Sequence, residues 1–145
     1  MRVSRVELVA AILAATLLTT VWFLLADHYD ALGIARNDDW SYLENAFRFA
    51  DAGIIAVGGW VQMTLIGQLV LAAPVIAIVG NSIASLQMLV GALGVLTLVC
   101  AYLVLRNFLT QSWAALSVLT LAGSALYGLL SVSFMTDLPA AAFQL

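Results

Sequence analysis

The chain has 145 residues, of which 64% are hydrophobic and only 9% are charged. Soluble domains are about half apolar and about a quarter charged, so this composition excludes an ordinary soluble domain and predicts an integral membrane protein that uses the lipid bilayer as its solvent. The net charge is only -3, there is no lysine, and the five arginines are scattered, which argues against a nucleic-acid partner.

The first apolar run covers residues 8–26. Its length is about 28 Å at 1.5 Å per residue, enough to cross the hydrocarbon core. Arg2 and Arg5 precede the run and Asp27 follows it, so the positive-inside rule predicts a cytoplasmic N-terminus. An uncleaved anchor is favoured over a cleaved signal peptide, whose apolar core is usually about 7–15 residues long.

Residues 27–82 are predicted to form a first outer loop. Within it, residues 38–52 have the periodicity of an amphipathic helix that would lie flat at the membrane interface, with Asp38 as N-cap and Gly53 as its C-terminal stop. Its apolar face would hold Trp40, Leu43, Phe47 and Ala50, and an exposed ion pair would join Glu44 to Arg48.

The next apolar piece, residues 63–79, contains Pro74 and is at the lower limit of length for a span. Residues 83–105 and 113–132 are long enough to cross, and a second outer loop would start at about residue 133. The fold class expected is therefore an all-α polytopic membrane protein with about three transmembrane helices.

The orientation of these spans depends on the piece 63–79. If it does not cross, Arg106 is cytoplasmic, and Asp137 lies outside with Asp38, as the positive-inside rule prefers. If it crosses, Arg106 lies outside and Asp137 inside. We favour the first arrangement, in which 63–79 is a re-entrant or interfacial helix packed in protein.

Small and polar residues indicate where helices touch. Gly91, Gly94, Ser124 and Gly128 would let helix backbones approach closely, and Gln68 and Gln87 are predicted to form helix–helix hydrogen bonds.

Three carboxylates at two membrane boundaries are the main candidates for chemistry. Asp38 and Asp39 follow the first span, and Asp137 follows the last one. Taken singly, each is explained as a helix cap. If the two boundaries face the same compartment, the three side chains would form one polar pocket, with ionised carboxylates able to accept a proton or hold a cation.

The order of four motifs resembles the first part of the membrane glycosyltransferases with the C-type fold, which include protein O-mannosyltransferases and lipid A aminoarabinose transferases. The motifs are Asp38-Asp39-x-x-Tyr42-x-x-x-Ala46, then Ile78-Val79-Gly80-Asn81-Ser82, then Ala101-Tyr102-Leu103-Val104-Leu105-Arg106, and finally Phe134-Met135-Thr136-Asp137-Leu138-Pro139. The resemblance covers nearly the whole chain, but only about the first quarter of a family member.

The resemblance implies transfer of a sugar from a polyprenyl-phosphate donor to an acceptor at the outer face of a cell membrane. It makes Asp38 the base, gives Asp39 and Asp137 catalytic or orienting roles, and places Tyr42 at the substrate. It leaves a divalent cation open as a cofactor, and the acceptor, whether protein, lipid or glycan, open as well.

Two features complicate this reading. Relatives carry a basic residue for the donor phosphate before the helix that begins here near residue 63, whereas this chain has Val61-Gln62-Met63-Thr64. Either Arg36 would then supply the positive charge for the donor phosphate, or a residue from a later part of the protein would supply it. The chain also stops at Leu145 within what reads as a starting helix, so we expect the N-terminal piece of a longer enzyme, inactive alone. The alternative functions are a fragment of a multi-span transporter and a non-catalytic subunit.

Overall fold

The computed structural model describes residues 3–36, 38–55 and 66–145. These ranges contain seven α-helices and no strand: α1 (Arg5–His28), α2 (Asp39–Ala52), α3 (Ile66–Val79), α4 (Ile83–Leu105), α5 (Gln111–Ala122), α6 (Ala125–Ser131) and α7 (Asp137–Gln144). The predicted all-helical class is confirmed. Residues 63–65 of the predicted short apolar helix lie outside the described ranges.

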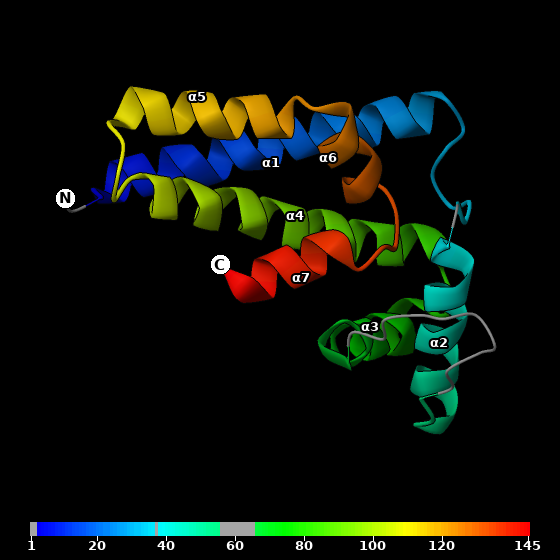
Figure 1. Ribbon diagram of the computed structural model, residues 1–145. Helices are drawn as coiled ribbons and strands as arrows, with labels where there is room; N and C mark the ends of the chain where they lie inside the picture. The colour runs from blue at the N-terminus through cyan, green and yellow to red at the C-terminus, as the bar shows by residue number, and fades with distance from the viewer. Residues whose placement is uncertain (1–2, 37, 56–65) are drawn as a thin grey trace.

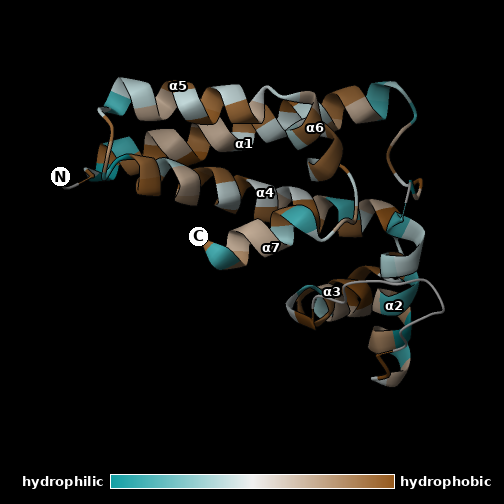
Figure 2. Ribbon diagram, viewed as in Figure 1, coloured by the Kyte–Doolittle hydropathy of each residue, from teal (hydrophilic) through white to brown (hydrophobic). Residues whose placement is uncertain are grey.

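Helices α1, α4 and α5 lie side by side and form a three-helix layer, while α2 and α3 lie together beyond one end of it (Figure 1). The hydropathy colouring shows apolar residues along α1, α3 and α4 and more polar ones on α2 (Figure 2). Within the described residues, α1 and α4 are each long and apolar enough to cross a membrane, and the bent pair α5–α6 is a third candidate. The chain is therefore consistent with a membrane protein.

Local sequence explains where the two long helices begin. The Ser4 hydroxyl accepts a hydrogen bond from the Glu7 backbone N–H at 3.1 Å and caps α1. Ser82 does the same for α4 by accepting from the Ser85 N–H at 3.3 Å. Each cap satisfies one of the backbone donors that a helix leaves unpaired at its N-terminus.

Glycines allow the helices to approach, as the sequence predicts. A Cβ atom on Gly91 would lie 2.4 Å from the Phe23 ring, and one on Gly128 would lie 2.5 Å from the Trp22 ring. Both distances are far inside van der Waals contact, so an aromatic residue of α1 packs directly onto a bare backbone of α4 or α6.

The predicted span 113–132 is not one straight helix: it breaks into α5 and α6 with a bend of 66°, and the pair is either a broken span or a re-entrant segment. Gly123 and Ser124 occupy the break. The Ser124 hydroxyl accepts from the Tyr127 N–H at 3.2 Å, which starts a new helix. The indole N–H of Trp22 donates to the Ala122 carbonyl at 2.8 Å, which satisfies the end of α5. Glycine–serine pairs are common sites of sharp helix kinks, and here both broken ends have polar partners.

Helix α2 forms where the sequence predicts it, and ends at Gly53 with φ at 68°, a left-handed conformation that favours glycine. Its exposed Glu44–Arg48 ion pair is present. However, it packs against α3 instead of presenting its whole apolar face to lipid: Leu43 and Ala46 lie in the same buried cluster as residues of α3, while Trp40 is 51% exposed.

Candidate functional site at the α2 end of the bundle

The loop that carries the Asp38-Asp39 pair is held by a buried glutamine of α4. The Gln87 side chain is fully buried. Its oxygen accepts from the Gly33 N–H at 2.8 Å, and its amide nitrogen donates to the Ile34 carbonyl at 3.1 Å. The predicted helix–helix hydrogen bond of Gln87 is therefore wrong. Its side chain bonds the backbone of the loop between α1 and α2 and holds that loop against α4.

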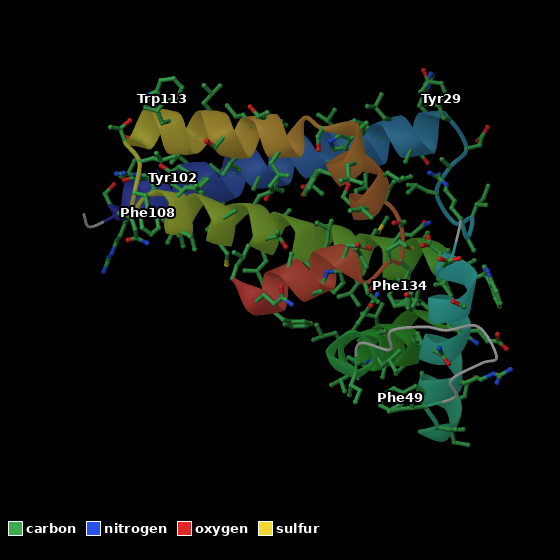
Figure 3. All side chains as sticks on the ribbon, viewed as in Figure 1. Tyr29, Phe49, Tyr102, Phe108, Trp113 and Phe134 are labelled. Carbon is green, nitrogen blue, oxygen red and sulfur yellow. The ribbon has the colours of Figure 1, made fainter. Side chains whose placement is uncertain are left out.

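Asp39 joins the first loop to the segment that follows α6. Its side chain is fully buried, and its Oδ2 atom accepts a hydrogen bond from the Phe134 backbone N–H at 3.1 Å. The two residues are 95 positions apart. Phe134 is itself fully buried and lies beside the start of α2 (Figure 3). The two acidic segments that the sequence singled out thus meet in the fold.

Two further side chains hold the segment after α6. Gln68 of α3 donates to the Met135 carbonyl at 3.4 Å, so it too bonds loop backbone and not a helix as predicted. The Thr97 hydroxyl of α4 shares its one donor between the Leu93 carbonyl of its own helix at 3.0 Å and the Leu138 carbonyl at 3.3 Å. With Asp39, polar side chains from α2, α3 and α4 converge on one short stretch of backbone, and this convergence sets the position of the start of α7.

The environment of Asp39 disfavours its charged form. Burial raises the pKa of its carboxyl group, and the N–H groups that face it and the positive charge of Arg36 offset only part of that effect. Among the described residues, no group donates to its buried Oδ1 atom. An unpaired carboxylate oxygen is costly to bury, so a proton on this carboxyl group would relieve that cost.

Asp38 has a different setting from its neighbour. It is partly exposed and occupies the N-cap position of α2, as predicted, but its side chain makes no capping hydrogen bond. The hydroxyl of Ser41 instead donates to the Asp38 backbone carbonyl at 2.8 Å. The Asp38 carboxylate therefore does not cap the start of α2.

The two residues assigned to substrate binding lie near this pair. The Arg36 guanidinium donates to the Ala31 carbonyl within the loop. Tyr42 lies in the first turn of α2, is partly buried and packs against the hydrophobic core. Arg36 thus lies on the same loop as Asp38, two positions before it.

Asp137 is not the N-cap that the sequence suggested. Thr136 takes that position, and Asp137 is the first residue of α7 and is exposed. The contact between Thr97 and Leu138 lies fourteen residues into α4, about 21 Å along its axis at 1.5 Å per residue. Helix α7 therefore runs beside α4, and Asp137 is not at the end of the bundle (Figure 1).

Asp137 still belongs to the same region as Asp39. It follows Phe134 by three residues, a separation of at most about 11 Å along an extended chain. Within the described ranges, no group of three or more His, Cys, Asp or Glu side chains is placed to hold a metal ion. The described residues therefore provide no set of ligands for the divalent cation that the resemblance left open.

The opposite end of the bundle holds a polar cluster that sequence reasoning missed. One oxygen of Glu7 accepts from the Tyr102 hydroxyl at 2.6 Å and from Arg106 Nε at 2.5 Å, and Arg106 also donates to the Leu109 carbonyl at 2.8 Å. The signal was available: one acid at the start of α1 and one arginine after α4 are a matched pair if both ends share a side.

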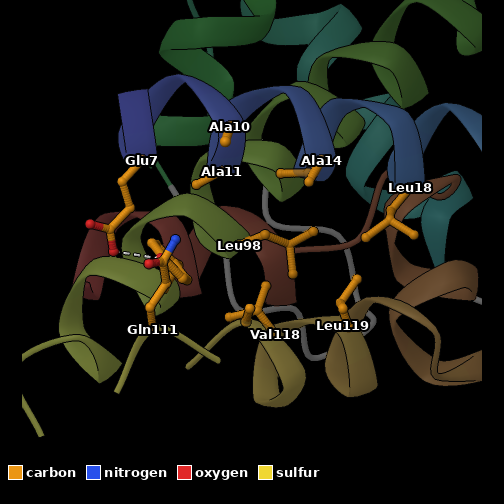
Figure 4. Close-up of a pocket in the computed structure, with 12 residues that line it drawn as sticks. Glu7, Ala10, Ala11, Ala14, Leu18, Leu98, Gln111, Val118 and Leu119 are labelled. Atoms are coloured by element: carbon orange, nitrogen blue, oxygen red, sulfur yellow. Dashed lines mark hydrogen bonds between the residues drawn. The ribbon is translucent and has the colours of Figure 1, made fainter. Parts of the chain in front are cut away.

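A cavity of about 220 Å³ lies beside this cluster, between α1, α4 and α5 (Figure 4). Small side chains of α1 open it, with Ala10, Ala11 and Ala14 along one wall and Leu98 of α4 opposite. Its walls are apolar apart from Glu7, Tyr102 and Gln111 at one end. Because Glu7 already bonds Arg106 and Tyr102, this cavity presents little free charge.

Comparison of the chain with known protein families, with curated proteins and with solved structures returned no match.

Proposed function

We propose that this chain forms the N-terminal part of a membrane glycosyltransferase that takes its sugar from a polyprenyl phosphate. The observation that carries the proposal is the hydrogen bond from the Phe134 N–H to Asp39, which brings the two acidic segments together at one end of the bundle. The resemblance of four ordered motifs to the C-type family supports the same reading, and it supplies the substrate class.

In the proposed reaction the acceptor hydroxyl attacks the anomeric carbon of the sugar. A carbon–oxygen bond forms there, the bond to the phosphate breaks, and the lipid phosphate leaves with the electron pair. Asp38 accepts the hydroxyl proton. Position and electrostatic stabilisation of the leaving phosphate supply the rest of the rate enhancement.

The different settings of the two carboxyl groups favour a division of roles. Asp38 is accessible and is the base. Asp39 is buried and holds the Phe134 segment, so it acts as a positioning residue more than as a base. Asp137 then orients donor or acceptor from the start of α7, and Tyr42 contacts substrate from the first turn of α2.

The proposed topology follows from the two ends of the bundle. The bond between Glu7 and Arg106 brings the start of α1 and the end of α4 to one side. We assign that side to the cytoplasm, count α1, α4 and the broken α5–α6 pair as three spans, and leave α3 as a short helix at the outer face. The reaction site is then at the outer face of a plasma or inner membrane.

The test is turnover of a labelled polyprenyl-phosphate sugar by membranes that contain the complete gene product. Sugar transfer that requires Asp38 supports the proposal, and complete absence of transfer to protein, lipid and glycan acceptors refutes it. Residues 1–145 expressed alone should give no turnover, because the donor site of a family member needs later segments. Turnover by that piece would contradict the domain assignment.

The bend between α5 and α6 favours one alternative, because discontinuous helices are common in transporters. A transporter fragment would carry solute or ion flux that depends on the acidic residues, with no glycosylated product. Flux measured in vesicles without a sugar donor separates the two functions.

A further inference from the structure

The cavity between α1, α4 and α5 opens at the side of the bundle. Leu98 of α4 forms its floor and is fully buried. Along its two edges, Ala10 and Ala14 of α1 are exposed and Leu119 of α5 is 48% exposed. Figure 4 shows Leu98 between the side chains of α1 and those of α5. The gap therefore meets whatever surrounds the bundle, which is lipid if α1 and α4 cross the membrane.

The gap has the depth of one membrane leaflet. Its lining follows α1 from Glu7 to Leu18, which is about 16 Å at 1.5 Å per residue. Half of the hydrocarbon core of a bilayer is about 15 Å. The polar residues of the lining are Glu7, Tyr102 and Gln111, and all three lie at the end where α1 and α5 begin. A polar mouth followed by an apolar body is the order of groups in a lipid that enters from that side of the bilayer.

The polar mouth carries little free charge. The Glu7 carboxylate already accepts hydrogen bonds from Tyr102 and Arg106, and the arginine neutralises it. The Gln111 side chain is exposed and forms no hydrogen bond within the described ranges. Its amide offers two N–H donors, which suit a neutral acceptor such as an ester carbonyl. The mouth therefore fits the ester group at the head of an acyl chain better than a phosphate.

We propose that this gap binds one acyl chain of a membrane glycerolipid, with the ester group at Gln111 and the chain between α1 and α5 over Leu98. An apolar cavity of about 150 Å³ stays dry and accepts benzene. The gap here is larger, at about 220 Å³, and its walls would lose dispersion contacts if it stayed empty. Such binding requires α1, α4 and α5 to lie in the bilayer, and it is independent of the proposed reaction.

The experiment titrates the complete protein, purified in detergent, with a phosphatidylglycerol that carries a diazirine in one acyl chain. Native mass spectrometry counts the bound lipid, and peptide mass spectrometry after irradiation locates the attachment. We expect attachment at the α1 and α5 residues of the lining. Unlabelled phosphatidylglycerol and phosphatidylethanolamine should compete equally, because they share ester-linked acyl chains. Undecaprenyl phosphate, which has an isoprenoid chain and no ester, should not compete, and competition by it would overturn the proposal.

Substitutions in the lining test whether the lipid occupies the gap. Ala14 is exposed at the gap, so Ala14→Phe should fill it without overpacking the core and abolish attachment to the lining. Leu13→Phe is the matched control, because Leu13 is 64% exposed and outside the lining, and it should bind as the wild type does. Gln111→Leu should weaken binding roughly 2–10-fold, as expected for one neutral hydrogen bond. Unchanged binding in Ala14→Phe or in Gln111→Leu would overturn the proposal.

The wild-type protein gives a test that does not depend on any variant. Attachment spread evenly over exposed positions such as Leu13, without enrichment at the lining, would overturn the proposal. A melting curve adds a second readout, because a ligand that binds the folded state raises the melting temperature. Added phosphatidylglycerol should raise it in the wild type and in Leu13→Phe but not in Ala14→Phe. An equal rise in Ala14→Phe would contradict binding in the gap.

Discussion

Buried polar groups find different kinds of hydrogen-bond partner at the two ends of the bundle. At the α5 start, Glu7 and Arg106 neutralise each other, and Tyr102 adds a third bond to the same carboxylate. At the α2 end, side chains of α2, α3 and α4 bond to loop backbone instead of to each other. The first end is a closed set of partners, whereas at the second end neither Asp38 nor Arg36 forms an ion pair within 4.0 Å among the described residues.

This difference teaches where chemistry can occur. The ion pair between Glu7 and Arg106 joins α1 to the end of α4, and groups that already bond each other are less available to bind a substrate. At the α2 end the loop backbone is held by the buried Gln87 side chain, and the Asp38 carboxylate makes no capping hydrogen bond. The α2 end therefore combines loops held by hydrogen bonds with a carboxylate that does not cap its helix, and the proposed function places the reaction there.

The largest effect is expected from a test of sidedness, which is all or none. Asp51 on α2 and Asn107 after α4 are both exposed, so single cysteines there can be placed in a Cys100→Ala background. An impermeant thiol reagent should label Asp51→Cys in intact cells and Asn107→Cys only after lysis. Labelling of both from outside would mean that α3 crosses the membrane and would break the comparison of an outer and an inner end.

The next largest effect concerns turnover. Asp38→Asn keeps the side-chain shape but removes the base, and loss of a general base usually lowers the rate about 10²–10⁴-fold. The rate is measured with a labelled lipid-linked sugar at equal membrane abundance. Glu44→Gln is the control, because an exposed helix ion pair contributes only about 0.3–0.5 kcal/mol. Near-normal turnover by Asp38→Asn would show that Asp38 is not the base.

The closed end is tested by breaking its pair. Glu7→Ala should lower the melting temperature in detergent, because Arg106 and the Tyr102 hydroxyl lose their shared acceptor. The double variant Glu7→Leu with Arg106→Met should be more stable than Glu7→Ala, since neither charge then lacks a partner. If the double variant is the less stable of the two, Glu7 and Arg106 do not form a closed pair. Turnover by the double variant should stay near normal.

Asp39 should show a moderate effect on stability. Asp39→Ala leaves the buried Phe134 N–H without an acceptor, which usually costs about 1–3 kcal/mol. Denaturant unfolding in detergent measures the loss. Asp39→Asn keeps an acceptor oxygen and should lose less than Asp39→Ala does. Equal loss in both variants would show that the hydrogen bond to Phe134 is not what holds the two segments.

The smallest effect is the pH dependence from the same residue. Burial raises the pKa of Asp39 in the folded protein above its unfolded value, so the folded state binds this proton more readily. The contribution to stability is therefore present at low pH, and is lost as pH rises from about 4, the ordinary aspartate value, through the raised pKa. Unfolding followed across this range should show that loss in the wild type and a flatter profile in Asp39→Asn. A contribution that instead grew with pH would contradict the buried, uncompensated state of Asp39.

Several features could be read from the sequence because they depend on local chemistry. The apolar runs of α1 and α4, the helix that ends at Gly53 and the close packing at Gly91 and Gly128 each follow from hydropathy, helix periodicity or the absence of a side chain. The sequence also marked the two acidic segments, because charge is rare in an apolar chain.

Only the tertiary structure decided which of these residues meet. Asp39 and Phe134 are 95 residues apart, and Glu7 and Arg106 are 99 residues apart, so their bonds depend on how the helices stack and not on local pattern. At the break between α5 and α6, the Ala122 carbonyl accepts a hydrogen bond from the Trp22 indole, 100 positions away in the sequence. Hydrophobicity determines that a segment is buried, but it does not determine which other segment it packs against. Hydrogen bonds are directional and therefore select the partner, and in this chain the partners come from distant parts of the sequence.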